Sequence, residues 1–141
     1  VHRILTDRGT KVTVIELNLD TVRRLRAEGH AAIYGDVLRP GTLEEAGIAT
    51  AGSLILSADV EDAAEITRQV RLLDPDLRIL VRCTHLRDVA ALRRAGATVV
   101  AAGEAEVAVA LAEAVTEGDE ADHGARAAHR ATLRRRLYDG P

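Results

Sequence analysis

The sequence predicts an α/β fold built around a parallel sheet. Short apolar runs of about five residues alternate with amphipathic stretches of about 7 to 13 residues, and the connections between them are short. Hydrophobic residues make up 47% of the 141-residue chain, which is enough to bury a core. Aromatic residues make up only 1%, so that core must consist of Leu, Val, Ile and Ala.

The first two predicted helices flank a β-branched strand. Residues 1–9 read as the last turns of a helix that Gly9 ends, and residues 11–15 read as a buried parallel strand. Asn18 or Asp20 can cap the next helix, and Gly29 can end it. The residues of this helix that we expect to face inward are Leu19, Val22 and Leu25.

The remaining elements repeat this alternation. A short strand at residues 31–34 precedes a helix that Pro40 begins and that runs to about Ala46. Further strands are expected at residues 53–57, 78–82 and 98–102, and further helices at residues 61–73, 86–96 and 104–116. In the helix at residues 61–73, the side chains at helical spacing are Ala63, Ile66, Val70 and Leu73.

Charge and cysteine content narrow the classes of function. The net charge is −3 and the pI is about 6.0, so no basic field attracts nucleic acid, and we expect no nucleic-acid partner. Cys83 is the single cysteine, which excludes an internal disulfide, and we interpret it as a small buried hydrophobe. No apolar run approaches the roughly 20 residues that span a bilayer. The chain begins at Val1 inside a helical pattern, from which we expect a piece of a longer protein.

Acidic residues follow two predicted strands that are adjacent in sequence. Glu16 ends the strand at residues 11–15 and turns straight into a helix, as does the ribose-binding acid of a Rossmann-like, doubly wound sheet. A carboxylate there favours NAD over NADP, although a plain surface glutamate explains Glu16 equally well. Asp36 follows the next strand and could contact adenine, or could simply be a turn residue.

Polar residues also follow the later strands. Asp59 comes after the strand at residues 53–57, and Arg82 ends the strand at residues 78–82. Ligands of open parallel sheets bind outside the carboxyl ends of the strands, so Arg82 could neutralise a phosphate, or it could pair with Asp59. The five histidines show no metal-ligand spacing, and no catalytic set is visible.

The last part of the chain offers surfaces for association. The helix at residues 104–116 is apolar nearly all round, which predicts burial on more than one side: against the sheet, and against a second subunit or the chain's own tail. Residues 117–141 form a separate segment, an acidic linker followed by a basic stretch that could be a terminal helix or a regulatory, partner-binding segment.

Several segments of the sequence are similar to those of a known domain family. VTVIELN, IYGDVLRPGTLEEAGIATAG and LRRAGATVVAAGEAEVAVALAEAV together resemble the TrkA-N, or RCK N-terminal, domain over about residues 1–115. The last helix looks most like the C-terminal domains of Kef-type cation:proton antiporters. The resemblance implies a domain at residues 1–116 in which the nucleotide is a regulatory ligand and not a reactant.

The resemblance also implies roles for individual residues. Glu16, with Leu17 beside it, would bind the ribose of NAD(H) or an adenine nucleotide, and Asp36 with Val37 would lie at the adenine. The remaining residues implied to line the nucleotide cleft or its phosphate and nicotinamide end are Ala58, Asp59, Arg82 and Glu104.

One part of the family pattern is missing from this chain. The family begins with a strand and a G-x-G-x-x-G loop, and neither precedes the helix at residues 1–9. In the strand order 3-2-1-4-5-6 that strand is central, so we expect a sheet with two unpaired edges and weak binding of pyrophosphate.

The leading hypothesis is a cytosolic nucleotide-binding regulatory domain that controls potassium or other monovalent cation transport, as in a Kef-type antiporter. We expect no enzyme activity, a homodimer through residues 104–116, and a membrane transporter domain in the parent protein at the cytoplasmic face of the membrane. The alternatives are an NAD-dependent oxidoreductase fragment that lacks its catalytic domain, and a fold remnant that serves only dimerisation.

Overall fold

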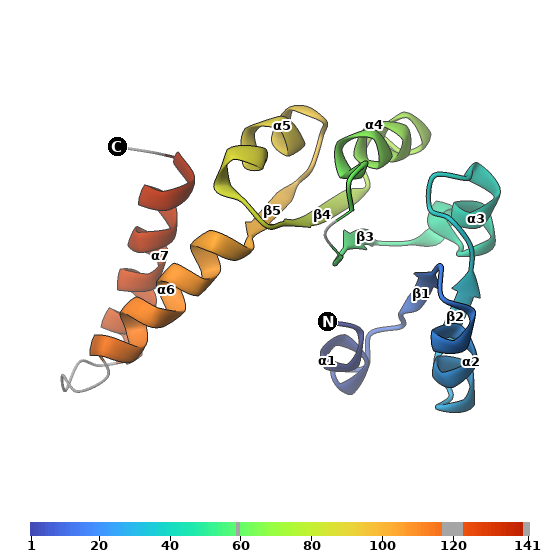
Figure 1. The fold of residues 1–141 in the computed structure, drawn as a ribbon, viewed down its shortest axis with the longest axis horizontal. Helices are drawn as coiled ribbons and strands as arrows, with labels where there is room; N and C mark the ends of the chain where they lie inside the picture. The colour runs from blue at the N-terminus through green and yellow to red at the C-terminus, as the bar shows by residue number, and fades with distance from the viewer. Residues whose placement is uncertain (59, 117–122, 140–141) are drawn as a thin grey trace. The chain divides into compact units, whose positions relative to one another are not determined.

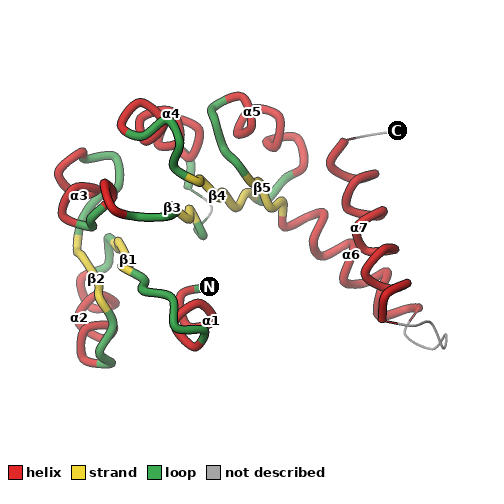
Figure 2. The backbone as a smooth tube through the Cα atoms, turned by 180° about the vertical axis from the view of Figure 1, so that it is seen from behind, coloured by secondary structure: helices red, strands yellow, loops and turns green. Residues whose placement is uncertain are grey.

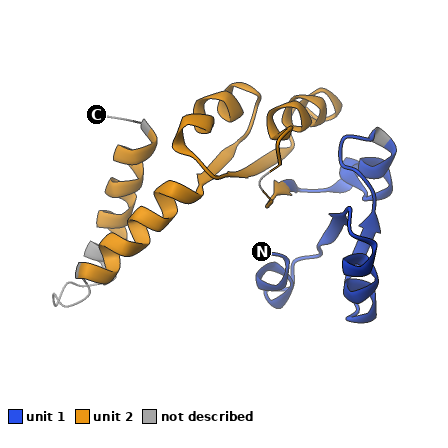
Figure 3. Cartoon of the chain, viewed as in Figure 1, with its two compact units in different colours: residues 1–54 blue, residues 55–141 orange. Residues whose placement is uncertain are grey.

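A computed structural model describes residues 1–58, 60–116 and 123–139, in which helices and strands alternate (Figures 1 and 2). The chain divides into two compact units, residues 1–54 and residues 55–141 (Figure 3). The strands are β1 (Thr13–Glu16), β2 (Ala31–Tyr34), β3 (Ser53–Leu56), β4 (Arg78–Cys83) and β5 (Val99–Ala102). The α-helices are α1 (His2–Asp7), α2 (Leu19–Ala27), α3 (Pro40–Glu45), α4 (Ala63–Leu73), α5 (Val89–Arg94), α6 (Gly103–Thr116) and α7 (His123–Asp139). Two 3-10 helices, η1 (Ile48–Thr50) and η2 (Leu86–Asp88), complete the described elements.

The strands form two sheets. β1 pairs with β2 in parallel, from Thr13 opposite Ala31 to Glu16 opposite Tyr34. The second sheet has the order β3-β4-β5, and β4 runs parallel to β5 from Leu80 opposite Val99. The prediction of an α/β fold with parallel strands is therefore confirmed. In the described part of the chain no strand pairing joins β1 to β3, the two strands expected to flank the missing central strand.

The first unit is built around a small apolar cluster. Val22, Leu25 and Ala32 are buried, and Val14 packs against them. Asn18 caps α2, because its side-chain oxygen accepts from the N–H groups of Asp20 and Thr21 at 3.0 Å. Asp20 lies in the first turn instead, so the alternative of Asp20 as the cap is wrong.

The inward-facing prediction was also wrong for the first residue of α2. Leu19 is 44% exposed. It lies at the first helical position, one turn before Val22, and the buried part of this face begins only at Val22.

The second unit has its core between α4, α5 and the strands. The most deeply buried large side chains of this unit are Ile66, Val70, Ile79 and Val81. Thr67 is a buried polar residue, and its hydroxyl donates to the carbonyl of Ala63 at 2.6 Å. Leu73 shares the helical spacing of Ala63, Ile66 and Val70 but is 55% exposed, because it is the last residue of α4.

Helix α6 has one fully buried side. Ala105 and Val109 are buried, whereas Val107, Leu111 and Val115 are 59%, 65% and 86% exposed. Helix α7 packs along α6, so the tail covers part of α6, as one of the two alternatives had it (Figure 1). Helix α6 thus contacts both β5 and α7, and its burial against a second subunit stays a prediction. The linker predicted at residues 117–122 lies outside the described residues.

No helix within the described ranges is long and apolar enough to cross a bilayer.

Candidate functional site

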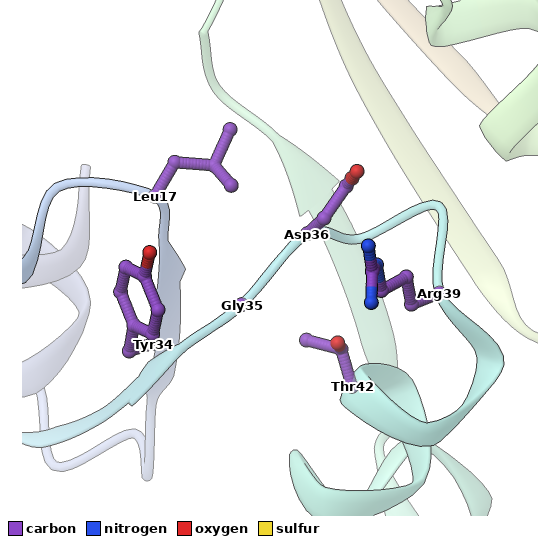
Figure 4. A pocket seen from close by; sticks show the side chains of 6 residues that line it. All are labelled: Leu17, Tyr34, Gly35, Asp36, Arg39 and Thr42. Atoms are coloured by element: carbon purple, nitrogen blue, oxygen red, sulfur yellow. The ribbon is translucent and has the colours of Figure 1, made fainter.

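A pocket of about 470 Å³ lies in the first unit, at the carboxyl ends of β1 and β2 (Figure 4). Two connections build it: the turn from β1 into α2, and the turn from β2 into α3. Its lining residues are Leu17, Tyr34, Gly35, Asp36, Arg39 and Thr42. Carboxyl ends of parallel strands are where ligands bind in open α/β sheets, which makes this pocket the candidate site.

The strand register brings the two turns together. Glu16 and Tyr34 are opposite each other at the ends of β1 and β2. The N–H of Gly35 donates to the carbonyl of Glu16 at 3.2 Å, one residue beyond the paired strands. Leu17 directly follows β1, and Tyr34 is the last residue of β2. They are 65% and 56% exposed. An aliphatic side chain and an aromatic ring therefore lie at one end of the pocket (Figure 4).

The side chain of Glu16 stabilises the turn beside the pocket. One oxygen of its carboxylate, Oε1, accepts from the N–H of Asn18 at 2.9 Å. Asn18 then caps α2, so the two side chains together fix the turn from β1 into α2. Glu16 is half-buried and is not among the lining residues, although its neighbour Leu17 is. Glu16 therefore has a local structural role in this turn, and its binding of ribose stays a prediction.

Asp36 has both a turn contact and a place in the pocket. Its Oδ1 accepts from the N–H of Leu38 at 2.9 Å, and its carbonyl accepts from the N–H of Arg39 at 3.0 Å. These contacts close the turn that leads into α3. Val37 lies inside this turn, half-buried, and does not line the pocket. The turn alternative for Asp36 thus describes part of what it does, and its side chain still borders the cavity (Figure 4).

Four lining residues were missed in the sequence. Tyr34 is one of only two aromatic residues in the chain, and its place directly before Gly35-Asp36 at a strand end was the signal that could have marked it. Gly35 is needed because a Cβ at this position would lie 2.8 Å from Cγ2 of Thr42. Arg39 is exposed and makes no ion pair with the described residues.

The other predicted site residues belong to the second unit. Ala58 is exposed after β3, and Arg82 is exposed on β4. The carboxylate of Glu104 accepts from the N–H of Leu86 at 2.9 Å and lies 3.9 Å from Nδ1 of His85. Asp59, and with it the alternative of an Arg82–Asp59 pair, lies outside the described residues. The first unit thus brings Leu17 and Asp36 into one pocket by itself.

The lining combines groups that suit a purine nucleotide. An aromatic ring and a leucine offer apolar surface to a flat base. The carboxylate of Asp36 accepts hydrogen bonds, as the exocyclic amine of adenine would require. The guanidinium of Arg39 can neutralise an anionic group such as a phosphate.

Comparison with known proteins shows which proteins this chain resembles. The curated protein KefC of Cronobacter sakazakii (strain ATCC BAA-894), a glutathione-regulated potassium-efflux system protein, is 35% identical over 95 residues. That match covers 67% of this chain and 15% of KefC, so the chain spans only a small part of the length of the curated relatives it matches.

Solved structures agree in fold. The TrkA-N domain of the inner membrane protein ybaL from Escherichia coli superposes with a TM-score of 0.76 and 29% identity, covering 79% of this chain and 84% of that one. The Kef C-terminal domain of Shewanella denitrificans in its AMP-bound form has a TM-score of 0.68 and 25% identity over 96% of this chain and 88% of that one. The GsuK channel bound to NAD has a TM-score of 0.63 and 28% identity over 70% of this chain and 18% of that one.

The model of the TrkA-N domain matches residues 1–103, which is most of the chain and includes the whole first unit and every predicted site residue except Glu104. The chain therefore belongs to the TrkA-N domain family.

Proposed function

We propose that this chain is a regulatory domain that binds an adenine nucleotide and controls a Kef-type potassium transporter. The pocket of the first unit carries the proposal, because it places Leu17, Tyr34 and Asp36 around one cavity at the carboxyl ends of two parallel strands. The AMP-bound Kef C-terminal domain and the NAD-bound GsuK channel support the choice of ligand.

The proposed binding mode assigns one part of the ligand to each group. The adenine ring lies against Leu17 and Tyr34, near Val37, and its exocyclic amine donates to Asp36. The ribose hydroxyls donate to the oxygen of Glu16 that does not hold Asn18. A 2'-phosphate would meet the negative charge of Glu16, so NAD is preferred over NADP. The roles that the family resemblance implies for Ala58, Asp59, Arg82 and Glu104 toward the remainder of a dinucleotide stay predictions.

In this proposal the nucleotide is a ligand that shifts a conformational equilibrium, and the domain has no enzyme activity of its own. A coupling of roughly 1–3 kcal/mol between nucleotide binding and domain packing is sufficient for such control. The packing partner is a second copy of this domain, which docks on the exposed stripe of Val107, Leu111 and Val115 on α6. The domain would act at the cytoplasmic face of the membrane, attached to a membrane transporter domain.

Isothermal titration calorimetry tests the ligand and the site together. AMP, NAD and NADH should each release or absorb heat with a 1:1 stoichiometry, and GMP should not, because its exocyclic amine is displaced from the position that Asp36 would read. Asp36→Asn and Glu16→Gln should weaken AMP binding by about tenfold each, which corresponds to one lost hydrogen bond. The matched control is Glu44→Gln, which removes an exposed carboxylate on α3 outside the pocket lining.

The choice of Gln at position 16 preserves the local turn. A glutamine oxygen can still accept from the N–H of Asn18, so loss of binding in Glu16→Gln would report on the ligand and not on the turn. Absence of heat with all three adenine nucleotides, or equal binding by Asp36→Asn and Glu44→Gln, would remove the proposal.

A further inference from the structure

Helix α7 is attached to the second unit chiefly by polar contacts. Arg134 donates from Nε to both carboxylate oxygens of Glu106 on α6, at 3.1 and 3.2 Å, and its Nη2 adds a third, shorter contact. One helical turn earlier, Arg130 pairs with Glu113 at 2.5 Å. Both arginines lie on one face of α7, at a spacing of four residues, and both carboxylates lie on the matching face of α6.

Tyr138 completes the attachment at the end of α7. Its hydroxyl accepts from the N–H of Ala102, the last residue of β5, at 2.7 Å, and donates to Oε1 of Glu106 at 3.1 Å. The guanidinium of Arg93, on α5, lies 5.9 Å from the centre of its ring. Ala102 is fully buried, so its N–H has no access to water and depends on this hydroxyl. One tyrosine thus joins α7 to α5, β5 and α6.

Apolar packing contributes little to the attachment of α7. Among residues 127–138, whose exposure is described, no side chain reaches the buried class. Leu133 is half-buried and Leu137 is 37% exposed. Helices of globular proteins are usually held by an apolar face, and ion pairs between exposed groups stabilise only weakly. Helix α7 therefore has few contacts that would make its release as costly as unfolding of the core.

We propose that α7 is a detachable arm, which a latch formed by Tyr138, Glu106 and Arg134 holds closed against α6. In the closed state the arm covers the acidic face of α6 and the outer edge of β5 at Ala102. In the open state α7 leaves as a unit, while the sheet β3-β4-β5 and helix α4 stay folded. Opening exposes Glu106 and an unpaired strand edge, which are surfaces that the closed chain hides.

Two features indicate that α7 opens as one unit and does not unfold gradually from its C-terminal end. The latch lies at the far end of α7 from the segment that connects it to α6, so its contacts must break together before the arm can swing away. The latch consists of three interactions: Arg134 with Glu106, Tyr138 with Glu106, and Tyr138 with Ala102. Glu106 takes part in the first two, because it accepts from both Arg134 and Tyr138. Loss of one partner should therefore loosen the other.

Hydrogen–deuterium exchange followed by mass spectrometry tests the proposal on the full 141-residue chain. Tyr138→Phe and Arg134→Ala should each speed exchange of the α7 amides about tenfold, while amides of β4 and α4 should exchange as in the wild type. The matched control is Arg135→Ala, since Arg135 is the next arginine on α7, is exposed, and makes no ion pair with the described residues. Its exchange pattern should equal that of the wild type.

Salt provides a second readout that needs no variant. Ion pairs between partly exposed groups are screened by salt, so raising NaCl from about 0.05 to 0.5 M should speed exchange in α7 of the wild type. An arm held by apolar burial would show no such increase. Exchange of α7 at the slow rate of β4, or an equal rise across the whole second unit in Tyr138→Phe, would overturn the proposal. So would an Arg135→Ala variant that matches Arg134→Ala.

Discussion

At the scale of single residues, the pocket depends on how closely the backbone of Gly35 approaches α3. An added Cβ would lie 2.8 Å from Cγ2 and 2.9 Å from Oγ1 of Thr42, closer than real Cβ contacts come. Gly35 is therefore required for space and not for an unusual backbone angle. The side chain at this point would also stand between Tyr34 and Asp36, at the middle of the pocket lining (Figure 4).

Gly35→Ala should consequently lower the free energy of unfolding by about 1–3 kcal/mol, as overpacked positions generally do. Urea denaturation followed by circular dichroism measures this change. Gly52→Ala is the matched control, because a Cβ at Gly52 meets no atom within 4 Å. Pairing Gly35→Ala with Thr42→Ala should recover part of the loss. A Gly35→Ala protein as stable as Gly52→Ala would contradict this account of the turn.

Asp36 could be placed at the site from the sequence because it follows the predicted strand at residues 31–34, and strand ends share an edge of the sheet. Leu17 was assigned to the site only through the family resemblance. The sequence did not allow Arg39 or Thr42 to be placed there. Their position depends on the angle at which α3 leaves the turn, and the packing of Thr42 against Gly35 sets that angle. Contacts of this kind are invisible in a pattern of hydrophobicity.

At the scale of elements, periodicity located the strands and helices well and their ends less well. The predicted strand at residues 31–34 coincides with β2, and the helix that begins at Pro40 coincides with the start of α3. Leu19, which was predicted to face inward, and Leu73, which lies at the helical spacing of buried residues, are both exposed. They are the first and last residues of their helices. A helical face continues in sequence beyond the point where a partner surface covers it, so terminal apolar residues cannot be assigned from spacing alone.

The ion pair between α6 and α7 should make the stability of this helix pair depend on pH. The hydrogen bonds from Arg134 lower the pKa of Glu106 below the ordinary glutamate value. A lowered pKa means that the folded state favours the charged form, so this contribution is present at neutral pH and is lost as the pH falls through the carboxylate range, about pH 4–5 and below.

Glu106→Gln should therefore be less stable than the wild type at pH 7, and this difference should shrink as the pH falls to about 3.5. Urea denaturation of both proteins across this range gives the difference directly. Glu44→Gln serves as the control, since Glu44 is exposed and has no ion pair among the described residues. A Glu106→Gln difference that is constant with pH would show that the charge of Glu106 contributes nothing.

The exposed stripe on α6 leads to a second prediction at this scale. If Val107, Leu111 and Val115 form a dimer contact, Leu111→Glu should place a buried, unpaired charge at its centre and weaken association by at least about tenfold. Sedimentation velocity over a concentration series measures the dimer fraction. Ala110→Glu adds the same charge at an exposed α6 position outside the stripe and should leave the dimer unchanged. Equal behaviour of the two variants would exclude this contact.

At the scale of the whole molecule, the sequence predicted parallel strands, and the family resemblance implied that the central strand is missing. Among the described residues, β1 does not pair with β3. The doubly wound strand order 3-2-1-4-5-6, without its central strand, agrees with β1 beside β2 and with the order β3-β4-β5. The chain contains no G-x-G-x-x-G motif. That loop and the helix after it normally supply the N–H groups that hold a pyrophosphate.

This chain should consequently gain little from the second half of a dinucleotide. Its affinity for NAD should lie within about tenfold of its affinity for AMP, because the adenosine half supplies most of the contacts. Competition calorimetry with AMP as the reference ligand measures the ratio. An affinity for NAD that exceeds the affinity for AMP by about 100-fold would mean that other groups hold the pyrophosphate.

The proposed function depends on binding of an adenine nucleotide in the pocket of the first unit. The most direct measurement is a titration of the ¹⁵N-labelled chain with AMP, followed residue by residue in amide NMR spectra. We expect saturable shifts that are largest at Leu17, Gly35 and Asp36, and absent with GMP. Saturable shifts confined to other parts of the chain, or no shifts at millimolar AMP, would contradict it.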